Sequence, residues 1–294
     1  MEKIDKFYQY KNLYACPICG KKIRFHAGSL VCKKEHCFDI SAKGYVNMMG
    51  ATKPLKGYDR QFFMSRSEFF AKGYYEHILN AIVKKVSEIK AAADGAAAGA
   101  DSKEGAESVS QLVLIDAGCG EGYYSSALAG RIEGLQIIAF DIAADAIVCA
   151  AKSKENVAWT IADVTNIPVK DGICDILLDV FTPASYKEFG RILKKGGYIL
   201  KVIPGSNHLK ELRKAAREQL KNKDYSGDDV SDYFEQHYDI LSQETLTNTM
   251  PIDQETLKTL TEMTPLLFDV DVSRLDLSEI SEITVEAQLI IGRA

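Results

Sequence analysis

The chain has 294 residues, 46% of them apolar and 26% charged, with a formal net charge of −5. This composition is typical of a globular protein with one main domain and one small appended module. It excludes a membrane-spanning helix, because no apolar run approaches the roughly 18 to 20 residues that such a helix needs. The start MEKIDKFYQY lacks the apolar core of a signal peptide. We therefore expect a cytoplasmic protein.

The charge is divided unevenly along the chain. Residues 1–60 hold twelve Lys and Arg against five Asp and Glu, a net charge of +7, which leaves −12 for the remainder. A basic front attracts nucleic acid, whereas the acidic bulk would repel it. We therefore expect any nucleic acid to bind at the front.

The front of the chain is also rich in cysteine. Cys16 and Cys19 stand three apart, Cys32 follows, and His36 and Cys37 are both candidates for a fourth ligand. Cytosolic cysteines are thiols or metal ligands, and two short pairs of ligands form a closed tetrahedral zinc site. Three buried thiols without a metal are the alternative, but so polar a segment could hardly fold without a bound metal. The spacing predicts one structural zinc.

Four segments are expected in chain order. Residues 1–50 form a zinc-binding, RNA-recognition module, and residues 51–90 form a linker and a leading helix, since SEFFAKGYYEHILNAIVKKVSEIK has apolar residues at helical spacing. Residues 91–108, rich in Ala, Gly and acids, have almost nothing to bury and are expected to be a disordered insertion. Residues 109–294 form the main domain.

The main domain begins with short apolar runs separated by helical segments: QLVLIDAG, LQIIAFDIA, AWTIADV, CDILLDVF and YILKVIP. Such runs predict strands of a sheet that helices cover on both faces. Near the C-terminus, LFDVDVS and EITVEAQLIIGR predict an antiparallel hairpin at one edge. The fold class is therefore α/β, with a doubly wound, mostly parallel, seven-stranded sheet and a small N-terminal zinc module.

A glycine-rich loop follows the first strand of this domain. Gly118, Gly120 and Gly122 allow a sharp turn and the close approach of a ligand, Asp116 precedes them, and the next strand ends at Asp141, whose carboxylate can accept both hydroxyls of a ribose. This combination resembles the class I S-adenosylmethionine-dependent methyltransferases. NAD, which also uses an acid at this place, is the alternative cofactor.

Two further segments fit this superfamily. Asp163 follows the third strand, where an acid often reaches the adenine amino group; the cap of a helix or turn is the alternative role. The run GRILKKGGYILKV resembles the helix, turn and fifth strand of the superfamily.

Together, the cysteine front and the methyltransferase body resemble the zinc-containing bacterial 23S rRNA (guanine-N1)-methyltransferases. The matching pieces run nearly end to end in order: CPICG, CKKEHCFDISAKGYVNMM, SRSEFFAKGYY, DAGCGEGYY, PGSNHLKEL and EMTPL. Residues 91–108 match nothing in this family.

The resemblance implies the residues of two sites. It places the zinc on Cys16, Cys19, Cys32 and His36, and it adds Tyr75, Gly120, Glu121 and His208 as contacts of S-adenosylmethionine. From the residues alone, Tyr75 could equally be a core aromatic and His208 a helix-start residue. No catalytic base is assigned: Asp179, after the fourth strand, is the nearest candidate, but the Asn/Asp-Pro-Pro-Tyr motif of amino-methylating relatives is absent.

The implied activity is methylation of N1 of a guanine in a 23S rRNA hairpin loop, because this nitrogen is inaccessible inside a paired helix. The partner is 23S rRNA, no membrane is involved, and the resemblance favours a homodimer. A small-molecule methyltransferase, such as one acting on a quinone precursor, a tRNA or protein methyltransferase, and a non-catalytic zinc module are the alternatives. The sequence does not identify the guanine.

Overall fold

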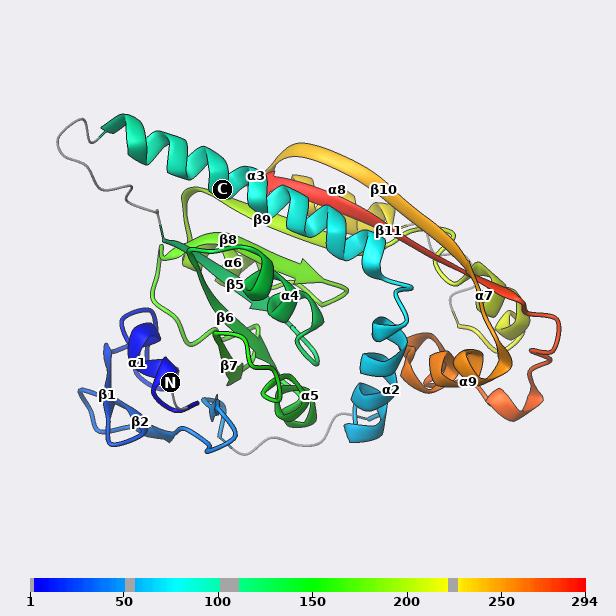
Figure 1. Cartoon of the computed structure of the whole chain (residues 1–294), viewed down its shortest axis with the longest axis horizontal. Coiled ribbons are helices and arrows are strands. Elements are labelled where there is room, and N and C mark those ends of the chain that lie inside the picture. The colour runs from blue at the N-terminus through cyan, green and yellow to red at the C-terminus, as the bar shows by residue number, and fades with distance from the viewer. Residues whose placement is uncertain (1–2, 51–55, 101–110, 222–226) are drawn as a thin grey trace.

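The computed structural model describes residues 3–50, 56–100, 111–221 and 227–294, and a large mixed sheet lies at its centre (Figure 1). The strands are β1 Ile23–His26, β2 Ser29–Cys32, β3 Cys37–Asp39, β4 Tyr45–Asn47, β5 Leu112–Ala117, β6 Leu135–Asp141, β7 Val157–Ile161, β8 Cys174–Val180, β9 Leu193–Pro204, β10 Asp239–Pro251 and β11 Glu282–Arg293. The helices are α1 Lys6–Tyr10, α2 Arg60–Ala71, α3 Glu76–Ala100, α4 Tyr123–Arg131, α5 Ala144–Ala150, α6 Tyr186–Ile192, α7 Lys210–Ala216, α8 Asp228–Glu235 and α9 Gln254–Met263, with 3-10 turns at Pro265–Leu267 and Val272–Arg274.

The central sheet has the strand order β10-β11-β9-β8-β5-β6-β7-β4. Strands β4 to β9 of this sheet pair in parallel, and β11 runs antiparallel to both β9 and β10. Every residue of β5 is buried, since alternate side chains enter the apolar clusters on the two faces of the sheet. The predicted doubly wound α/β fold is confirmed.

An eighth strand, β4, extends the predicted seven-stranded sheet. It comes from the N-terminal module and pairs in parallel with β7 through Tyr45–Trp159, Val46–Thr160 and Asn47–Ile161. We expected these residues to belong to the N-terminal module. The pairing covers the edge of β7, whose backbone groups would otherwise be unpaired.

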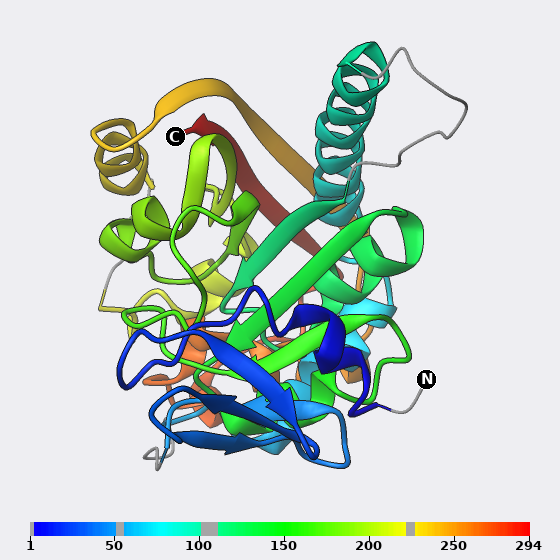
Figure 2. The same ribbon diagram turned by 90° about the vertical axis from the view of Figure 1, so that its left-hand side faces the viewer.

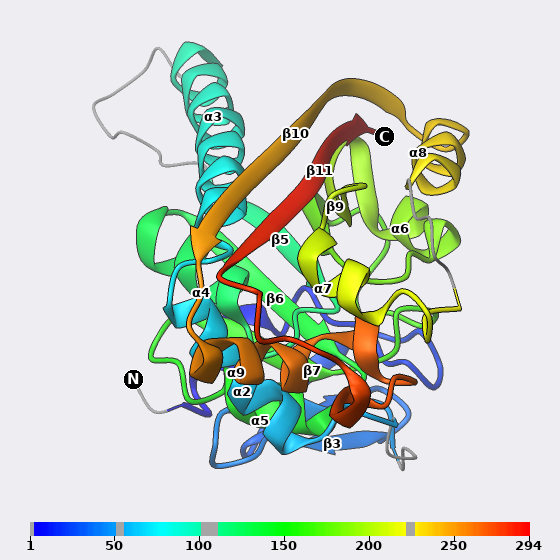
Figure 3. The same cartoon turned by 90° about the vertical axis from the view of Figure 1, so that its right-hand side faces the viewer.

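The C-terminal hairpin forms, but its outer strand was predicted in the wrong place. The segment 267–273 contributes to 3-10 turns, and β10 is the partner of β11 (Figure 3). Most side chains of β10 are exposed, so this edge strand needs few apolar residues and gives only a weak signal in the sequence.

The predicted leading helix is two helices, α2 and α3, separated by a turn at residues 72–75 in which Gly73 has φ of +87°. The expected disorder of residues 91–108 was wrong for residues 91–100, because α3 continues to Ala100. Alanine has the highest intrinsic helix propensity, so this stretch can extend a helix without burying much surface. Residues 101–108, and residues 51–55 of the expected linker, lie outside the described residues.

The N-terminal module packs against the sheet and shares its apolar core (Figure 2). The hydroxyls of Tyr14 and Thr160 lie 2.6 Å apart in a buried contact, and the Tyr10 hydroxyl donates to the backbone carbonyl of Asn156 at 2.7 Å. Phe7 and Leu30 of the module belong to the same buried cluster as the sheet residues on that face. The front is therefore fixed to the α/β domain.

In the described part of the chain, no helix combines the length and the apolarity that crossing a membrane requires.

Candidate zinc centre and cofactor cavity

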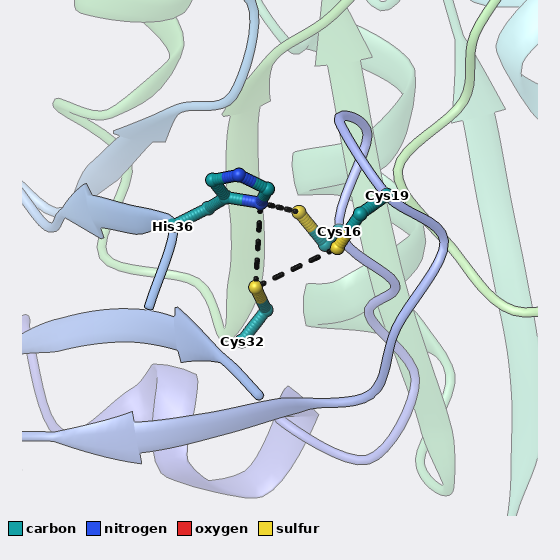
Figure 4. A group of neighbouring side chains, drawn as sticks. All are labelled: Cys16, Cys19, Cys32 and His36. Carbon is teal, nitrogen blue, oxygen red and sulfur yellow. Dashed lines mark hydrogen bonds between the residues drawn. The ribbon is translucent and has the colours of Figure 1, made fainter. Parts of the chain in front are cut away.

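Three cysteines and one histidine meet in the N-terminal module (Figure 4). The ligand atoms of Cys16, Cys19, Cys32 and His36 all lie within 4.8 Å of one another. Nδ1 of His36 lies 3.4 Å from Cys16 Sγ and 3.5 Å from Cys32 Sγ, and the sulfurs of Cys19 and Cys32 are 3.7 Å apart. Zn–S bonds of about 2.3 Å and a Zn–N bond of about 2.0 Å in a tetrahedron give edges of roughly 3.5 to 3.8 Å, so the donor set fits zinc.

Two tight turns bring these ligands together. Gly20, after the first cysteine pair, has φ of +67°, and its N–H donates to the carbonyl of Cys16 at 2.7 Å. Glu35, before the histidine, has φ of +60°, and the N–H of Lys34 donates to Cys32 Sγ at 3.3 Å. Each turn forms one half of the site from residues close in sequence, so the spacing predicts a metal site here but does not decide between His36 and Cys37 as its fourth ligand.

Cys37 does not join the cluster. Its side chain is exposed, and Sγ lies 3.6 Å from Asp39 Oδ1. Neighbouring residues of a strand point to opposite sides, so the chain at this point can direct only one of the two side chains, His36 or Cys37, to the sulfurs. The geometry supports His36 as the fourth ligand.

A cavity of about 630 Å³ lies at the carboxyl ends of β5, β6, β7 and β8. Helix α2 forms one wall, and residues 263–266, from the last residue of α9 into the following 3-10 turn, form another. This is the edge at which open α/β sheets bind ligands, and the volume is typical of a small-molecule pocket. Ile142 is 38% exposed in the cavity wall, so the site offers an apolar surface as well as polar groups.

The three glycines of the loop after β5 are needed for different reasons. Gly118 and Gly122 allow close packing, since a Cβ would lie 2.1 Å from Thr182 Oγ1 at the first and 2.5 Å from the Trp159 ring at the second. Gly120 has φ of +55° and no atom within 4 Å of where a Cβ would be, and it lines the cavity. Its bare backbone therefore leaves room for a ligand.

Asp141 ends β6 beside this loop. One carboxylate oxygen accepts from Gly120 N at 2.9 Å and the other from Ala143 N at 2.8 Å. Burial raises the pKa of Asp141, and these two N–H donors oppose the rise. Since each oxygen keeps a second lone pair, the fixed carboxylate can accept two vicinal hydroxyls.

Both parts of the chain are similar to known families. A family profile described as "RlmA, N-terminal" matches residues 14–53, and one described as "Methyltransferase domain" matches residues 108–262. YxjB of Bacillus subtilis (strain 168), a proposed 23S rRNA (guanine-N(1)-)-methyltransferase, is 31% identical over 291 residues, which cover 96% of this chain and 97% of YxjB. The chain belongs to the 23S rRNA (guanine-N1)-methyltransferase family.

Two other known proteins are similar to the chain. The 23S rRNA (guanine(748)-N(1))-methyltransferase of Streptomyces fradiae is 26% identical to this family member, with 95% of each chain covered. The crystal structure of a proposed methyltransferase from Bacillus halodurans C-125 has a TM-score of 0.43 and 14% identity, and covers 62% of this chain and 92% of that one.

The structure brings most of the predicted cofactor residues of this methyltransferase to one cavity. Those lining it are Tyr75, Gly118, Gly120, Asp141, Asp163 and His208. Asp163 also caps a turn, because its Oδ1 accepts from Thr165 N at 2.8 Å. Both roles considered for this residue are thus compatible with its position.

Three predicted residues support the glycine loop without lining this cavity. Asp116 is buried beneath it and accepts from the Ser125 hydroxyl at 2.6 Å, and burial raises the pKa of Asp116 to about 7. Gly122 packs on Trp159, and Glu121 is turned toward α2 and a neighbouring cleft. The presence of these three residues in the sequence pattern is explained by their role in shaping the loop.

Tyr75 and His208 come from segments 133 residues apart and meet in the cavity wall, with the Tyr75 hydroxyl 3.4 Å from His208 Nε2. His208 Nδ1 lies 2.8 Å from the carbonyl of Glu286, so Nδ1 is the protonated nitrogen and Nε2 is an acceptor. Burial lowers the pKa of His208 to about 4. The imidazole is therefore neutral at pH 7.

Asp179 is not placed to act on a substrate in this cavity. It is fully buried, and Lys201 Nζ lies 2.7 Å from its Oδ2. Its neighbours Leu178 and Val180 enter the apolar cluster on one face of the sheet, so Asp179 faces the other. The hypothesis that Asp179 accepts the guanine proton has no support from this geometry.

Sequence analysis did not identify Arg66, which also lines the cavity. It lies in the SRSEFFAKGYY stretch, one of the family's matching pieces, but nothing in the local pattern distinguishes it from a solvated helix residue.

Proposed function

We propose that this protein transfers the methyl group of S-adenosylmethionine to N1 of a guanine in 23S rRNA. The observation that carries the proposal is the match to a family of this activity over nearly the whole chain, zinc front included. The cavity at the carboxyl edge, with its glycine loop and Asp141, supports the cofactor, and the four-ligand cluster supports one structural zinc. A small-molecule methyltransferase would share the cavity but would have no need of the basic zinc front.

When bound, the cofactor would supply an electrophilic methyl group on a sulfonium. The transfer leaves the electrons of the broken C–S bond on the sulfur, and guanine N1 loses its proton to solvent. The task of the protein is to hold the guanine nitrogen about 3 to 3.5 Å from that methyl group, in line with the bond that breaks. Asp141 would hold the ribose, and Ile142 and Val164 would flank the adenine at the ends of β6 and β7. Tyr75 and His208 would lie beside the methionine end.

Part of the cavity wall is apolar and suits a flipped base. This part includes Phe181, Pro183, Pro204, Leu209, Met263, Pro265 and Leu266. Guanine N1 is available only when the base leaves its stack, so the substrate is an unpaired guanine of a hairpin loop. Apolar walls would exclude water from the methyl group while the base is held.

The basic front would hold the RNA. Lys21, Lys22, Lys33 and Lys34 are all exposed around the zinc cluster, and Arg24 is exposed but lies 3.2 Å from Glu35. Because the front is fixed to the sheet through β4, RNA bound there would have a defined position relative to the cavity.

Replacing Lys21, Lys22, Lys33 or Lys34 with Gln is expected to lower the slope of log affinity against log salt by up to about one unit per lost phosphate contact. Arg24→Gln should have a smaller effect, because Glu35 already neutralises Arg24. Filter binding to a 23S rRNA hairpin at several salt concentrations measures the slopes. Lys84→Gln, an exposed lysine of α3, is the matched control. Equal slopes for the control and the front variants would show that the RNA binds elsewhere.

The activity itself is tested by primer extension. Methylation of guanine N1 blocks base pairing, so reverse transcriptase should stop at one guanine of 23S rRNA after incubation with the zinc-loaded protein and S-adenosylmethionine. The stop should be absent when the cofactor is omitted. If naked and ribosomal RNA both remain unmodified while a small quinol accepts the methyl group, the small-molecule alternative replaces this proposal.

We also expect a cytoplasmic homodimer, on the strength of the family resemblance and of the location of an rRNA substrate. Sedimentation equilibrium distinguishes the dimer from a monomer.

A further inference from the structure

Arg66 of α2 lies in the wall of the cofactor cavity, close to the glycine loop. Its Nε is 3.2 Å from Oε2 of Glu121, and its guanidinium carbon lies 4.9 Å from the centre of the Phe70 ring. The Arg66 side chain is 19% exposed and that of Glu121 only 4%. The two charges are thus held together, with the arginine on the cavity side.

This pair is poorly satisfied within the described residues. Arg66 Nε and Glu121 Oε2 are both buried and lie 3.2 Å apart, and within the described residues neither atom has a further hydrogen-bond partner; the buried hydroxyl of the nearby Tyr124 has none. A guanidinium has five N–H donors, and burying a charge without hydrogen bonds is costly. A ligand with acceptor atoms at this place would offset the cost.

The chemistry of the cavity indicates which acceptor this is. S-adenosylmethionine has one anionic group, the α-carboxylate of its methionine end. If Asp141 holds the ribose and the adenine lies toward Asp163, the methionine end extends along the glycine loop toward α2. A guanidinium binds a carboxylate through two parallel hydrogen bonds, which a lysine cannot reproduce.

We infer that Arg66 binds the α-carboxylate of S-adenosylmethionine and that Glu121 is a positioning residue that orients Arg66. This inference rests on the proposed function, because it deepens the same cofactor site. Phe70 supports the flat face of the guanidinium, so the planar group is aligned before the ligand enters.

A second arginine, Arg213 of α7, lines the same cavity and provides the internal comparison. Its Nε donates to the backbone carbonyl of His208 at 2.9 Å, which ties it to the segment after β9 and not to the glycine loop. The α-carboxylate of S-adenosylmethionine would therefore lie in a different place if Arg213 bound it than if Arg66 bound it.

The test uses the zinc-loaded full chain and two ligands that differ only in the carboxylate: S-adenosylmethionine and its decarboxylated form. Calorimetry should show that the wild-type protein prefers S-adenosylmethionine by roughly 10- to 100-fold, the range for hydrogen bonds to a charged group. Arg66→Met should bind the two ligands about equally, and Arg66→Lys should show an intermediate preference. Arg213→Met should keep the wild-type preference.

A further variant separates lost binding from lost folding. Arg66→Met leaves Glu121 as an uncompensated buried charge, so the double variant Arg66→Met, Glu121→Gln removes that charge as well. It should unfold at the wild-type temperature and still show no preference between the ligands.

A preference retained by Arg66→Met, or lost in Arg213→Met, would overturn the inference and leave the proposed function standing. The same holds if the wild-type protein binds both ligands equally. If the wild-type protein binds neither, the proposed function fails together with the inference.

Discussion

Replacing Cys16 with Ser, or removing the metal with a chelator, is expected to destabilise the protein by most of its folding free energy. Zinc binding contributes on the order of 10 kcal/mol to the folding of a small zinc module. A whole domain has a net stability of only about 5–15 kcal/mol. The loss would reach beyond the front, because β4 covers the edge of β7 and Tyr14 packs in the shared core.

Thermal unfolding and metal analysis of the same samples test this expectation. Cys37→Ser is the matched control, since this cysteine is exposed and outside the cluster. It should keep one zinc per chain and the wild-type unfolding temperature. Full zinc content in Cys16→Ser would contradict the proposed metal centre, and loss of zinc in Cys37→Ser with retention in His36→Ala would assign the fourth ligand to Cys37.

The second large effect is expected at Asp141. Asp141→Ala should weaken the binding of S-adenosylmethionine by about 1.5 to 3 kcal/mol, the typical range for hydrogen bonds to a charged group. The loss should be at the upper end of this range, because the same carboxylate fixes the backbone of Gly120 at 2.9 Å and of Ala143 at 2.8 Å. Removing the Asp141 carboxylate therefore breaks its hydrogen bonds to the backbone of the glycine loop as well as those to the ribose.

Titration calorimetry measures this loss, and primer extension should show a matching loss of methylation when the cofactor is not saturating. Asp145→Ala removes the same charge four residues away, from an exposed position in the first turn of α5, and should bind as the wild type does. Unchanged affinity in Asp141→Ala, or tighter binding of NAD than of S-adenosylmethionine by the wild-type protein, would reject the cofactor assignment.

Local patterns explain which elements could be predicted. β5 and β8 are covered on both faces, so their sequences are almost continuously apolar and identify them as strands. β10 is exposed at the edge of the sheet, and its polar sequence does not distinguish it from a loop. Residues 91–100 were predicted to be disordered because they have little apolar surface to bury. Their high intrinsic helix propensity explains why they continue helix α3 instead.

The amino-acid sequence by itself predicted a metal site on Cys16, Cys19, Cys32 and either His36 or Cys37, the buried strands and the glycine loop with its following acid. Each depends on residues close together in the chain, whose spacing fixes the geometry. Only the tertiary structure decided that β4 completes the sheet, that Tyr75 meets His208, that Asp179 is buried against Lys201, and that Arg66 lines the cavity. These positions follow from contacts between distant segments, and a local pattern cannot specify them because it does not say which surfaces the fold will bring together.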